Sequence, residues 1–220
     1  MIEGLKQVLT SLDRSVFHSE ADFQHALAWK IKEKFKDAKI RLEKPFNVDG
    51  KVFYIDIFIE INNKKLGIEL KYKTKKLNKL IKDEEYNLKD QGARDLGRYD
   101  FCKDIFRIER FIEKGYIDWG LVILLTNDKG YQTGNGSKKQ SKETIDSQFR
   151  LPHGKKLEGN MIWNRTPKWT NGRGEILLKG NYDISWREHD KDHGFDILII
   201  EIKKDFRVSL SKRKGEVGDD

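Results

Sequence analysis

Two carboxylates and a lysine stand close together in the apolar segment 46–73. Asp56 lies in the first of two apolar runs, and Glu69 and Lys71 lie in the second. Both runs are rich in β-branched and aromatic residues and flank the polar sequence 62–65, a pattern typical of a β-hairpin. Because side chains alternate between the two faces of a strand, we expect Asp56, Glu69 and Lys71 to converge across this hairpin.

Such a cluster suits hydrolysis of a phosphodiester bond. Carboxylate oxygens hold Mg²⁺, the ion lowers the pKa of its bound water, and a nearby ammonium orients the nucleophile or stabilises the transition state. The alternative is that Glu69 and Lys71 form a solvated strand edge, as charged residues on strands commonly do. Asp56 argues against this alternative, because it stands among apolar neighbours, where a buried carboxylate needs a cation or a donor.

The pattern of Asp56 followed thirteen positions later by Glu69-x-Lys71 resembles the active-site signature of the PD-(D/E)XK nuclease superfamily. This superfamily includes many restriction endonucleases and Holliday-junction resolvases. Ile55 stands where the family has its proline, which binds nothing. The resemblance covers about residues 15–126 and implies an α/β, restriction-endonuclease-like core of a helix, a three-stranded meander, a helix and a strand.

The resemblance also implies roles for individual residues. Asp56 and Glu69 become metal ligands, the backbone carbonyl of Leu70 becomes a further ligand, and Lys71 becomes the group that stabilises the transition state or orients the water. Mg²⁺ is the implied cofactor, with Mn²⁺ as a substitute. Members of the family often complete the site with an acid from the first helix, and this role passes to Glu20.

The segment around Glu20 has the features of a helix start. Ser19 is suited to be the N-cap, with Asp22 three positions later in capping-box position. Glu20 then lies in the first turn, where compensation of the helix dipole is the alternative to a metal-binding role. The buried stripe of this helix is expected at Phe23, Leu27, Ile31 and Trp29.

The segment 77–115 is interpreted as one or two helices that end at Gly115. Some branches of the superfamily place a glutamine at the start of this helix, as Gln-x-x-x-Tyr. Gln91 matches the glutamine, although Asp95 stands in place of the tyrosine, so Gln91 is an auxiliary catalytic candidate. Arg94 and Arg98 are candidate phosphate contacts, with pairing to aspartates on the helix surface as the alternative.

A lysine-rich run surrounds the candidate site. Residues 64–82 hold eight lysines and one glutamate, and the whole chain has a formal net charge of +8. A surface of this charge attracts phosphates, although a solvated loop that maintains solubility has a similar composition. The candidate nucleic-acid contacts are Lys73, Lys75, Lys76, Lys79, Arg94 and Arg98. DNA is favoured over RNA as the partner, and a homodimer is left open.

Composition places the chain among globular proteins. Its 220 residues, 37% of them hydrophobic, fit one α/β domain. The mean hydropathy of −0.75 argues against a membrane span. The single cysteine, Cys102, excludes an internal disulfide framework. With a first stretch that does not resemble a signal peptide, we expect a cytoplasmic protein.

The remainder of the chain is divided by composition. The nuclease-like core is expected at 1–126 and closes with a buried strand in 118–128. A flexible loop is expected at 127–148 because glycine, serine and lysine predominate there. A β-rich extension at 149–206 is expected to pack on the same domain, and a disordered tail at 207–220. The aromatic residues of the extension either fill the core or stack on bases.

A second Glu-x-Lys occurs at Glu201 and Lys203, within the last apolar run. Only seventeen residues follow it, so it lacks the helix and strand that the superfamily places after the motif, and it is interpreted as a strand that ends in a solvated charged edge. The sequence therefore predicts a metal-dependent nuclease at the first motif. Two alternatives remain: a catalytically inactive nucleic-acid-binding module, and a small-molecule enzyme or structural subunit in which the acids only pair with Lys71.

Overall fold

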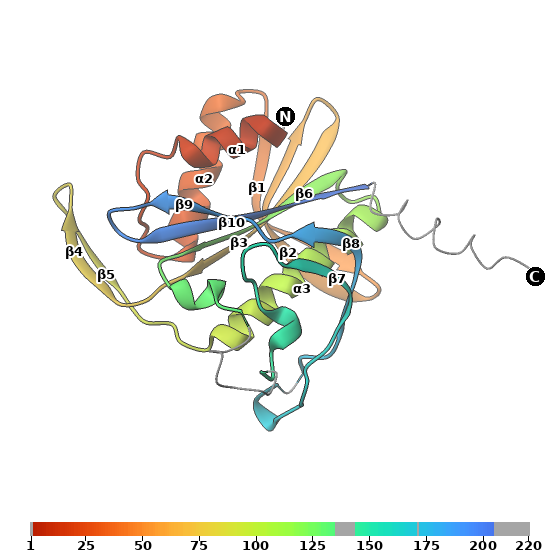
Figure 1. Cartoon of the computed structure of the whole chain (residues 1–220). Helices are drawn as coiled ribbons and strands as arrows, with labels where there is room; N and C mark the ends of the chain where they lie inside the picture. The colour runs from red at the N-terminus through yellow and green to blue at the C-terminus, as the bar shows by residue number, and fades with distance from the viewer. Residues whose placement is uncertain (1, 135–143, 171, 205–220) are drawn as a thin grey trace, which may run out of the picture.

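The computed structural model describes residues 2–134, 144–170 and 172–204. The expected tail and the middle of the expected loop at 127–148 lie outside these residues. A six-stranded mixed sheet in the order β1-β2-β3-β6-β10-β9 forms the centre of the fold (Figure 1). Its strands are β1 (Lys39–Val48), β2 (Lys51–Ile61), β3 (Lys64–Lys73), β6 (Trp119–Thr126), β9 (Trp186–Asp190) and β10 (Phe195–Lys203). The expected α/β class is confirmed.

The first three strands form an antiparallel meander, and the expected hairpin is its second half. Asn62 and Asn63 form the turn between β2 and β3, with φ of 50° and 57°. Positive φ at both positions is what a two-residue hairpin turn requires, and asparagine tolerates it. β6 then lies parallel to β3 in the sheet, with Glu69 opposite Val122. The hairpin therefore lies beside a strand that is buried on both faces.

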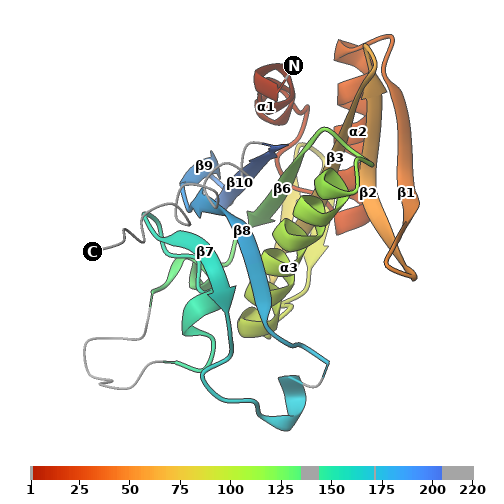
Figure 2. The ribbon, with the colours of Figure 1, turned by 90° about the vertical axis from the view of Figure 1, so that its right-hand side faces the viewer.

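Helices and a small second sheet cover the two faces of the central sheet. The side that packs on Ile57, Ile68 and Leu70 carries α1 (Ile2–Thr10) and α2 (Glu20–Lys34). The opposite side carries α3 (Arg94–Glu113) and the two-stranded sheet of β7 (Lys156–Met161) and β8 (Ile176–Asp183). Figure 2 shows β8 alongside α3. None of the helices within the described residues has the length and apolar content needed to span a bilayer.

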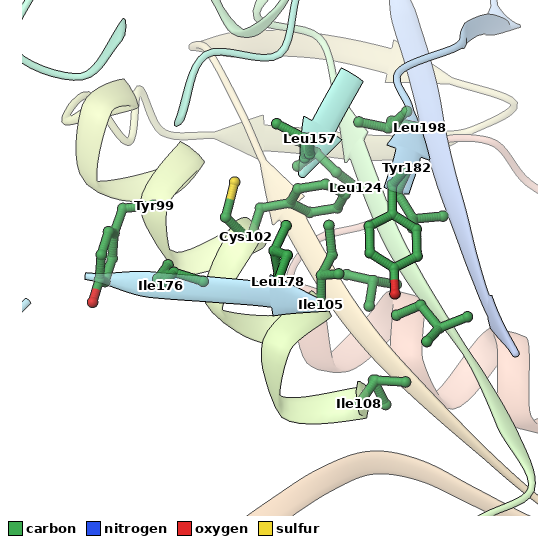
Figure 3. Packing of buried hydrophobic residues seen from close by; sticks show 14 of the residues in the cluster. Tyr99, Cys102, Ile105, Ile108, Leu124, Leu157, Ile176, Leu178, Tyr182 and Leu198 are labelled. Atoms are coloured by element: carbon green, nitrogen blue, oxygen red, sulfur yellow. The ribbon is translucent and has the colours of Figure 1, made fainter. Parts of the chain in front are cut away.

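The third of the chain after residue 149 contributes strands to the central sheet and to the small sheet that covers it. β9 and β10 extend the central sheet, whereas β7 and β8 pack on α3 through a shared apolar cluster (Figure 3). The buried Glu109 of α3 accepts hydrogen bonds from the Tyr182 hydroxyl at 2.7 Å and the Gly180 N–H at 2.8 Å. Trp163, Tyr182 and Trp186 are buried, so these aromatic residues belong to the core.

Helix α2 begins as expected. The Ser19 side chain accepts a hydrogen bond from the Asp22 N–H, and the helix starts at Glu20. Phe23, Leu27 and Ile31 form its buried stripe. The expectation that Trp29 belongs to this stripe is wrong, since its side chain is 72% exposed and its indole N–H binds Glu33. Trp29 lies two positions from both Leu27 and Ile31, which places it on the opposite side of the helix.

The expected helix between β3 and Arg94 is wrong, because this segment forms a hairpin of β4 (Leu77–Ile81) and β5 (Glu84–Leu88). Lys82 and Asp83 form its turn with positive φ, and Tyr86 and Leu88 alternate with exposed residues along β5. Along β5 the buried Tyr86 and Leu88 are two positions apart, which is the period of a strand and not of a helix. In Figure 1 this hairpin extends away from the rest of the fold.

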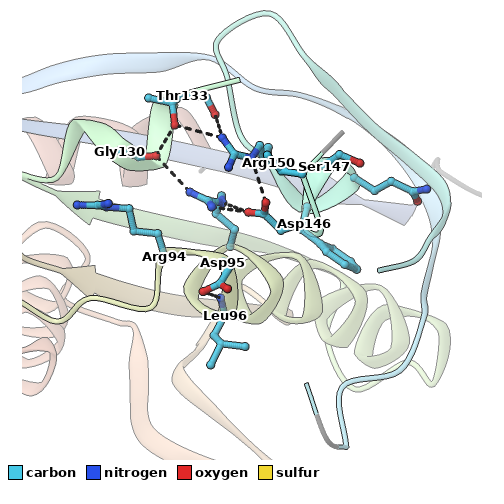
Figure 4. A network of polar contacts seen from close by, with 12 residues as sticks. Arg94, Asp95, Leu96, Gly130, Thr133, Asp146, Ser147 and Arg150 are labelled. Carbon is cyan, nitrogen blue, oxygen red and sulfur yellow. Dashed lines mark hydrogen bonds and ion pairs between the residues drawn. The ribbon is translucent and has the colours of Figure 1, made fainter. Parts of the chain in front are cut away.

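Helix α3 is held to the segment that precedes β7 by a buried ion pair. The Arg98 Nε donates to Asp146 at 2.8 Å, and Arg98 is only 4% exposed (Figure 4). The expected role of Arg98 as a nucleic-acid contact is therefore wrong. Arg94 binds Asp128 and remains partly exposed. Both arginines pair with aspartates from other elements, which sequence spacing along the helix does not predict.

We expect Arg98→Ala to lower the free energy of unfolding by about 3 kcal/mol, because removing one partner leaves the Asp146 carboxylate buried without its main counter-charge. Urea denaturation monitored by circular dichroism measures this change. Arg165→Ala is the matched control, since Arg165 is exposed and its loss should leave the midpoint almost unchanged. Similar midpoints for the two variants would show that the buried pair is not a stability determinant.

Candidate active site

The centre of the candidate site is the point where β2 separates from β3. Pairing of the two strands ends at Ile57 and Ile68. Beyond this pair the N–H groups of β3 are taken by side chains: the Asp56 carboxylate accepts from Leu70 at 2.6 Å, and the Glu20 carboxylate accepts from Tyr72 at 2.7 Å. The gap between the strands therefore holds a carboxylate from β2 and one from the start of α2.

Glu69 and Lys71 project from β3 toward α3, as alternation predicts. The Arg107 Nη2 donates to Glu69 Oε2 and to Asp104 Oδ1, each at 2.6 Å. The Lys71 Nζ lies 2.8 Å from Asp104 Oδ2 and donates to the Leu70 carbonyl at 3.1 Å. Lys71 thus connects the residues on α3 with the gap that contains Asp56.

The site has more negative than positive charge. Glu20, Asp56, Glu69 and Asp104 supply four carboxylates, and Lys71 and Arg107 supply two cations. Glu69 is completely buried, and its Oε1 has no hydrogen-bond partner among the described residues. A buried carboxylate oxygen without a partner is costly, so this imbalance calls for a further cation.

The pKa values reflect the same imbalance. Burial raises the pKa of the Asp56 carboxyl to about 6, and repulsion from Asp104 and Glu20 adds to the effect of burial. Burial, together with repulsion from Asp104 and Asp56, raises the pKa of Glu69 well above its usual range. Burial alone would lower the pKa of Lys71, but the surrounding carboxylates outweigh it and raise that pKa, so Lys71 is an ammonium at neutral pH.

The donors present fit a hard divalent cation. Asp56 and Glu69 offer carboxylate oxygens, and in an extended strand the Leu70 carbonyl points to the same side as the Leu70 N–H, which Asp56 binds. With all four carboxylates ionised, the site has two excess negative charges, which one divalent ion would balance. Within the described ranges, no group of three or more His, Cys, Asp and Glu side chains is already arranged as a metal site. The fit therefore rests on two carboxylates and a carbonyl.

Gln91 and the lysine run, the other candidates from the sequence, are spread over several elements. Gln91 is exposed in the segment before α3, and its N–H binds the Thr74 carbonyl. The lysine run is divided in space. Lys64 and Lys65 lie at the turn end of β3, and Lys73 is its last residue, with Lys75 and Lys76 just after it. Lys79 lies on the β4–β5 hairpin. Adjacency in sequence therefore does not make the run one surface.

Asp104 and Arg107 were missed by sequence reasoning. Each contacts a residue of the Glu-x-Lys motif from α3, although more than thirty positions separate them from it. One signal was present, since Asp104 stands between the buried Cys102 and Ile105 in the apolar stripe of the helix. A charged residue at such a position requires a partner of opposite charge.

The second Glu-x-Lys, at Glu201 and Lys203, has a different electrostatic environment. Glu201 pairs with Lys6 at 2.9 Å and with Lys203 at 2.7 Å, so both its carboxylate oxygens face lysines. Lys203 on the same strand and Lys6 on α1 thus balance the charge of Glu201 without a metal ion. Burial acts to raise its pKa, but the bonds with these lysines outweigh burial and lower it, the reverse of the shift at Glu69.

Comparisons with known proteins give little further information. No family model matches the chain, and no curated protein matches it. The chain is similar to a solved structure titled "Crystal structure of SSO0001", with 18% sequence identity and a TM-score of 0.25. The matched region covers 47% of this chain and 44% of that one. A TM-score of this size does not establish a common fold.

We expect Asp56→Asn to raise the melting temperature of the metal-free protein at pH 8. The raised pKa of Asp56 means that its ionised form destabilises the fold above the pKa of the unfolded chain, and asparagine has no such charge while its carbonyl still accepts from Leu70. Thermal unfolding in EDTA measures the gain, which should shrink below pH 6 as wild-type Asp56 gains a proton. A variant that melts lower than wild type at pH 8 would contradict this expectation.

Proposed function

We propose that this protein is a metal-dependent nuclease of the PD-(D/E)XK type that hydrolyses phosphodiester bonds, with DNA as the favoured substrate. The observation that carries the proposal is the cluster of four carboxylates and two cations at this point, in which Glu69 is buried with an unpartnered oxygen and Lys71 is fixed beside it. The proposal is also supported by the order of α2, the β1–β3 meander, α3 and β6, although the β4–β5 hairpin is inserted between β3 and α3. The cytoplasmic location indicated by the sequence belongs to the same proposal.

The residues divide the chemistry between them. Asp56, Glu69 and the Leu70 carbonyl would hold Mg²⁺ or Mn²⁺, which supplies an activated water and offsets charge on the phosphate. Lys71 stays protonated, so it stabilises negative charge on the reacting phosphate and does not act as a base. Asp104 fixes the position of Lys71, and Arg107 fixes that of Glu69. Glu20 holds the Tyr72 N–H and adds negative charge at the edge of the site.

The alternative is an inactive nucleic-acid-binding module on the same fold. Binding of phosphates alone needs exposed cations and gives no reason to bury Glu69 with an unpartnered oxygen. A protein that only bound nucleic acid would gain stability by replacing these acids with apolar residues. The buried charge therefore favours the enzyme.

The proposal is tested by incubating the purified protein with supercoiled plasmid and with branched and single-stranded DNA, in Mg²⁺, Mn²⁺ or EDTA. We expect cleavage of at least one substrate with either ion and no cleavage in EDTA. Binding without cleavage in both ions would favour the inactive module. If the protein neither binds nor cleaves DNA, a function unrelated to nucleic acid would be favoured.

We expect the affinity for nucleic acid to fall linearly with salt concentration on logarithmic axes, because phosphate contacts release counterions. Lys75 and Lys76 are partly or fully exposed at the end of β3 nearest the site. Lys75→Glu with Lys76→Glu should flatten the slope by about two, or roughly one for each contact. Fluorescence anisotropy over a salt series measures this slope. The same slope in both proteins would place the binding surface elsewhere.

A further inference from the structure

A cavity of about 550 Å³ opens beside the candidate active site, between the start of β2 and helix α3. Its volume lies within the range of small-ligand sites. Arg107 belongs to both places: it lines the cavity, and its guanidinium binds Glu69 and Asp104. A ligand in this cavity would therefore touch the residue that positions the Glu69 carboxylate.

The lining combines cations with aromatic rings. On α3, Lys103, Phe106, Arg107 and Arg110 follow the spacing of one helix face. On β2, Lys51 and Phe53 are two positions apart and share a face of the strand. The rings of Phe53 and Phe106 are only partly buried, so each retains exposed surface.

Charge in the cavity favours an anionic ligand. Asp49 is the acidic residue of the lining, and it is compensated by Arg110 and by Lys114, whose Nζ lies 2.6 Å from it. Lys51 and Lys103 are exposed and have no ion pair among the described residues. Two uncompensated ammonium groups beside two aromatic rings suit a phosphate attached to a base.

We propose that this cavity binds one unpaired nucleotide of the substrate, next to the phosphate that is cleaved, so that the enzyme prefers single-stranded or frayed nucleic acid to an intact duplex. The base would stack on Phe53 or Phe106, and the phosphate would bind Lys103 or Lys51. Arg107 lines the cavity and binds the Glu69 carboxylate, which places the base beside one of the proposed metal ligands. A paired base inside a duplex exposes no face for such stacking.

This inference rests on the proposed function for the identity of the neighbouring site, but binding can be tested without cleavage. The probes are a short single-stranded DNA that carries 2-aminopurine and a blunt duplex of the same sequence, both in EDTA. Fluorescence of 2-aminopurine falls when the base stacks, and anisotropy of a terminal dye gives the affinity. The proteins are wild type, Phe106→Leu, Lys103→Glu and the control Lys191→Glu, which changes an exposed lysine between β9 and β10, at the opposite edge of the sheet.

We expect wild type to bind the single strand more tightly than the duplex and to quench 2-aminopurine. Phe106→Leu should weaken single-strand binding about fivefold or more and lose the quenching, and Lys103→Glu should weaken binding while retaining part of the quenching. The control should match wild type. Melting temperatures confirm that the variants are folded, and Lys103→Glu changes an exposed side chain, so it remains informative if Phe106→Leu is unstable.

Two results would overturn the inference: equal affinity of wild type for single strand and duplex, or wild-type binding by both cavity variants. Neither result would affect the proposed hydrolysis, which the cleavage assay tests separately. Conversely, quenching that depends on Phe106 in a protein that cleaves no substrate would support the nucleotide subsite and refute the proposed function.

Discussion

Replacing Glu69 by glutamine should reduce metal-dependent cleavage about a thousandfold, the upper range for loss of one electrostatic contact in an active site. The amide has nearly the same shape but carries no charge, so it cannot balance a divalent ion, and it also removes the negative charge that pairs with Arg107. Single-turnover cleavage of the preferred substrate, with enzyme in excess, measures the chemical step without interference from product release.

The matched control for this variant is supplied by the second Glu-x-Lys of the chain. Glu201→Gln with Lys203→Ala removes the same chemical groups from β10, where Lys6 and Lys203 already compensate the glutamate. This double variant should cleave at close to the wild-type rate. The opposite pattern, an active Glu69→Gln and an inactive double variant, would place the active site at the other motif.

Replacing Lys71 by alanine should lower the cleavage rate about a hundredfold to a thousandfold while the affinity for Mn²⁺ changes little. The ammonium acts on the reacting phosphate, whereas the ion is held by oxygen atoms of other residues. Loss of Lys71 removes a positive charge from beside Asp104 and Asp56, so metal binding should, if anything, become tighter.

Single-turnover cleavage and calorimetric titration with Mn²⁺ separate these two effects of Lys71→Ala. Lys71→Arg is a useful companion, because it keeps the charge but changes its shape and position. It should recover part of the lost rate. A Lys71→Ala protein that cleaves like wild type would remove this lysine from the mechanism, and one that fails to bind Mn²⁺ would mean that Lys71 organises the metal site.

Local patterns predicted the parts of the site that lie on one hairpin. The asparagine turn and the alternation along β3 place Glu69 and Lys71 correctly, because register follows from neighbours in sequence. Asp56 lies beyond the last β2–β3 pair, and Ile55 and Ile57 beside it pack into different clusters, so alternation alone does not predict its position. The cap at Ser19 likewise places Glu20 at the start of α2. Asp104 and Arg107 were not predicted, since they meet the hairpin only when α3 packs across the sheet, and helical spacing does not identify a partner on another element.

Three expectations drawn from the sequence differ from the structure. Arg98 looked like a surface cation because its partner, Asp146, lies 48 positions away and is brought to it only by the fold. Residues 77–88 were expected to be helical, whereas Lys82 and Asp83 adopt the positive φ of a turn and the segment pairs as the β4–β5 hairpin. The lysine run looked like one charged surface, whereas the length of β3 separates Lys64 and Lys65 from Lys73. Charged residues that are close in sequence form one surface only if the strands and helices that carry them bring them to the same side of the molecule.

The central claim is that a divalent ion binds between β2 and β3 at Asp56 and Glu69. Anomalous scattering from crystals soaked in Mn²⁺ tests this claim most directly, because it locates the ion without assuming its ligands. We predict a peak within coordination distance of Asp56, Glu69 and the Leu70 carbonyl in wild type, and no peak there in Asp56→Asn. A peak only beside Glu201, or the same peak in both proteins, would contradict the account.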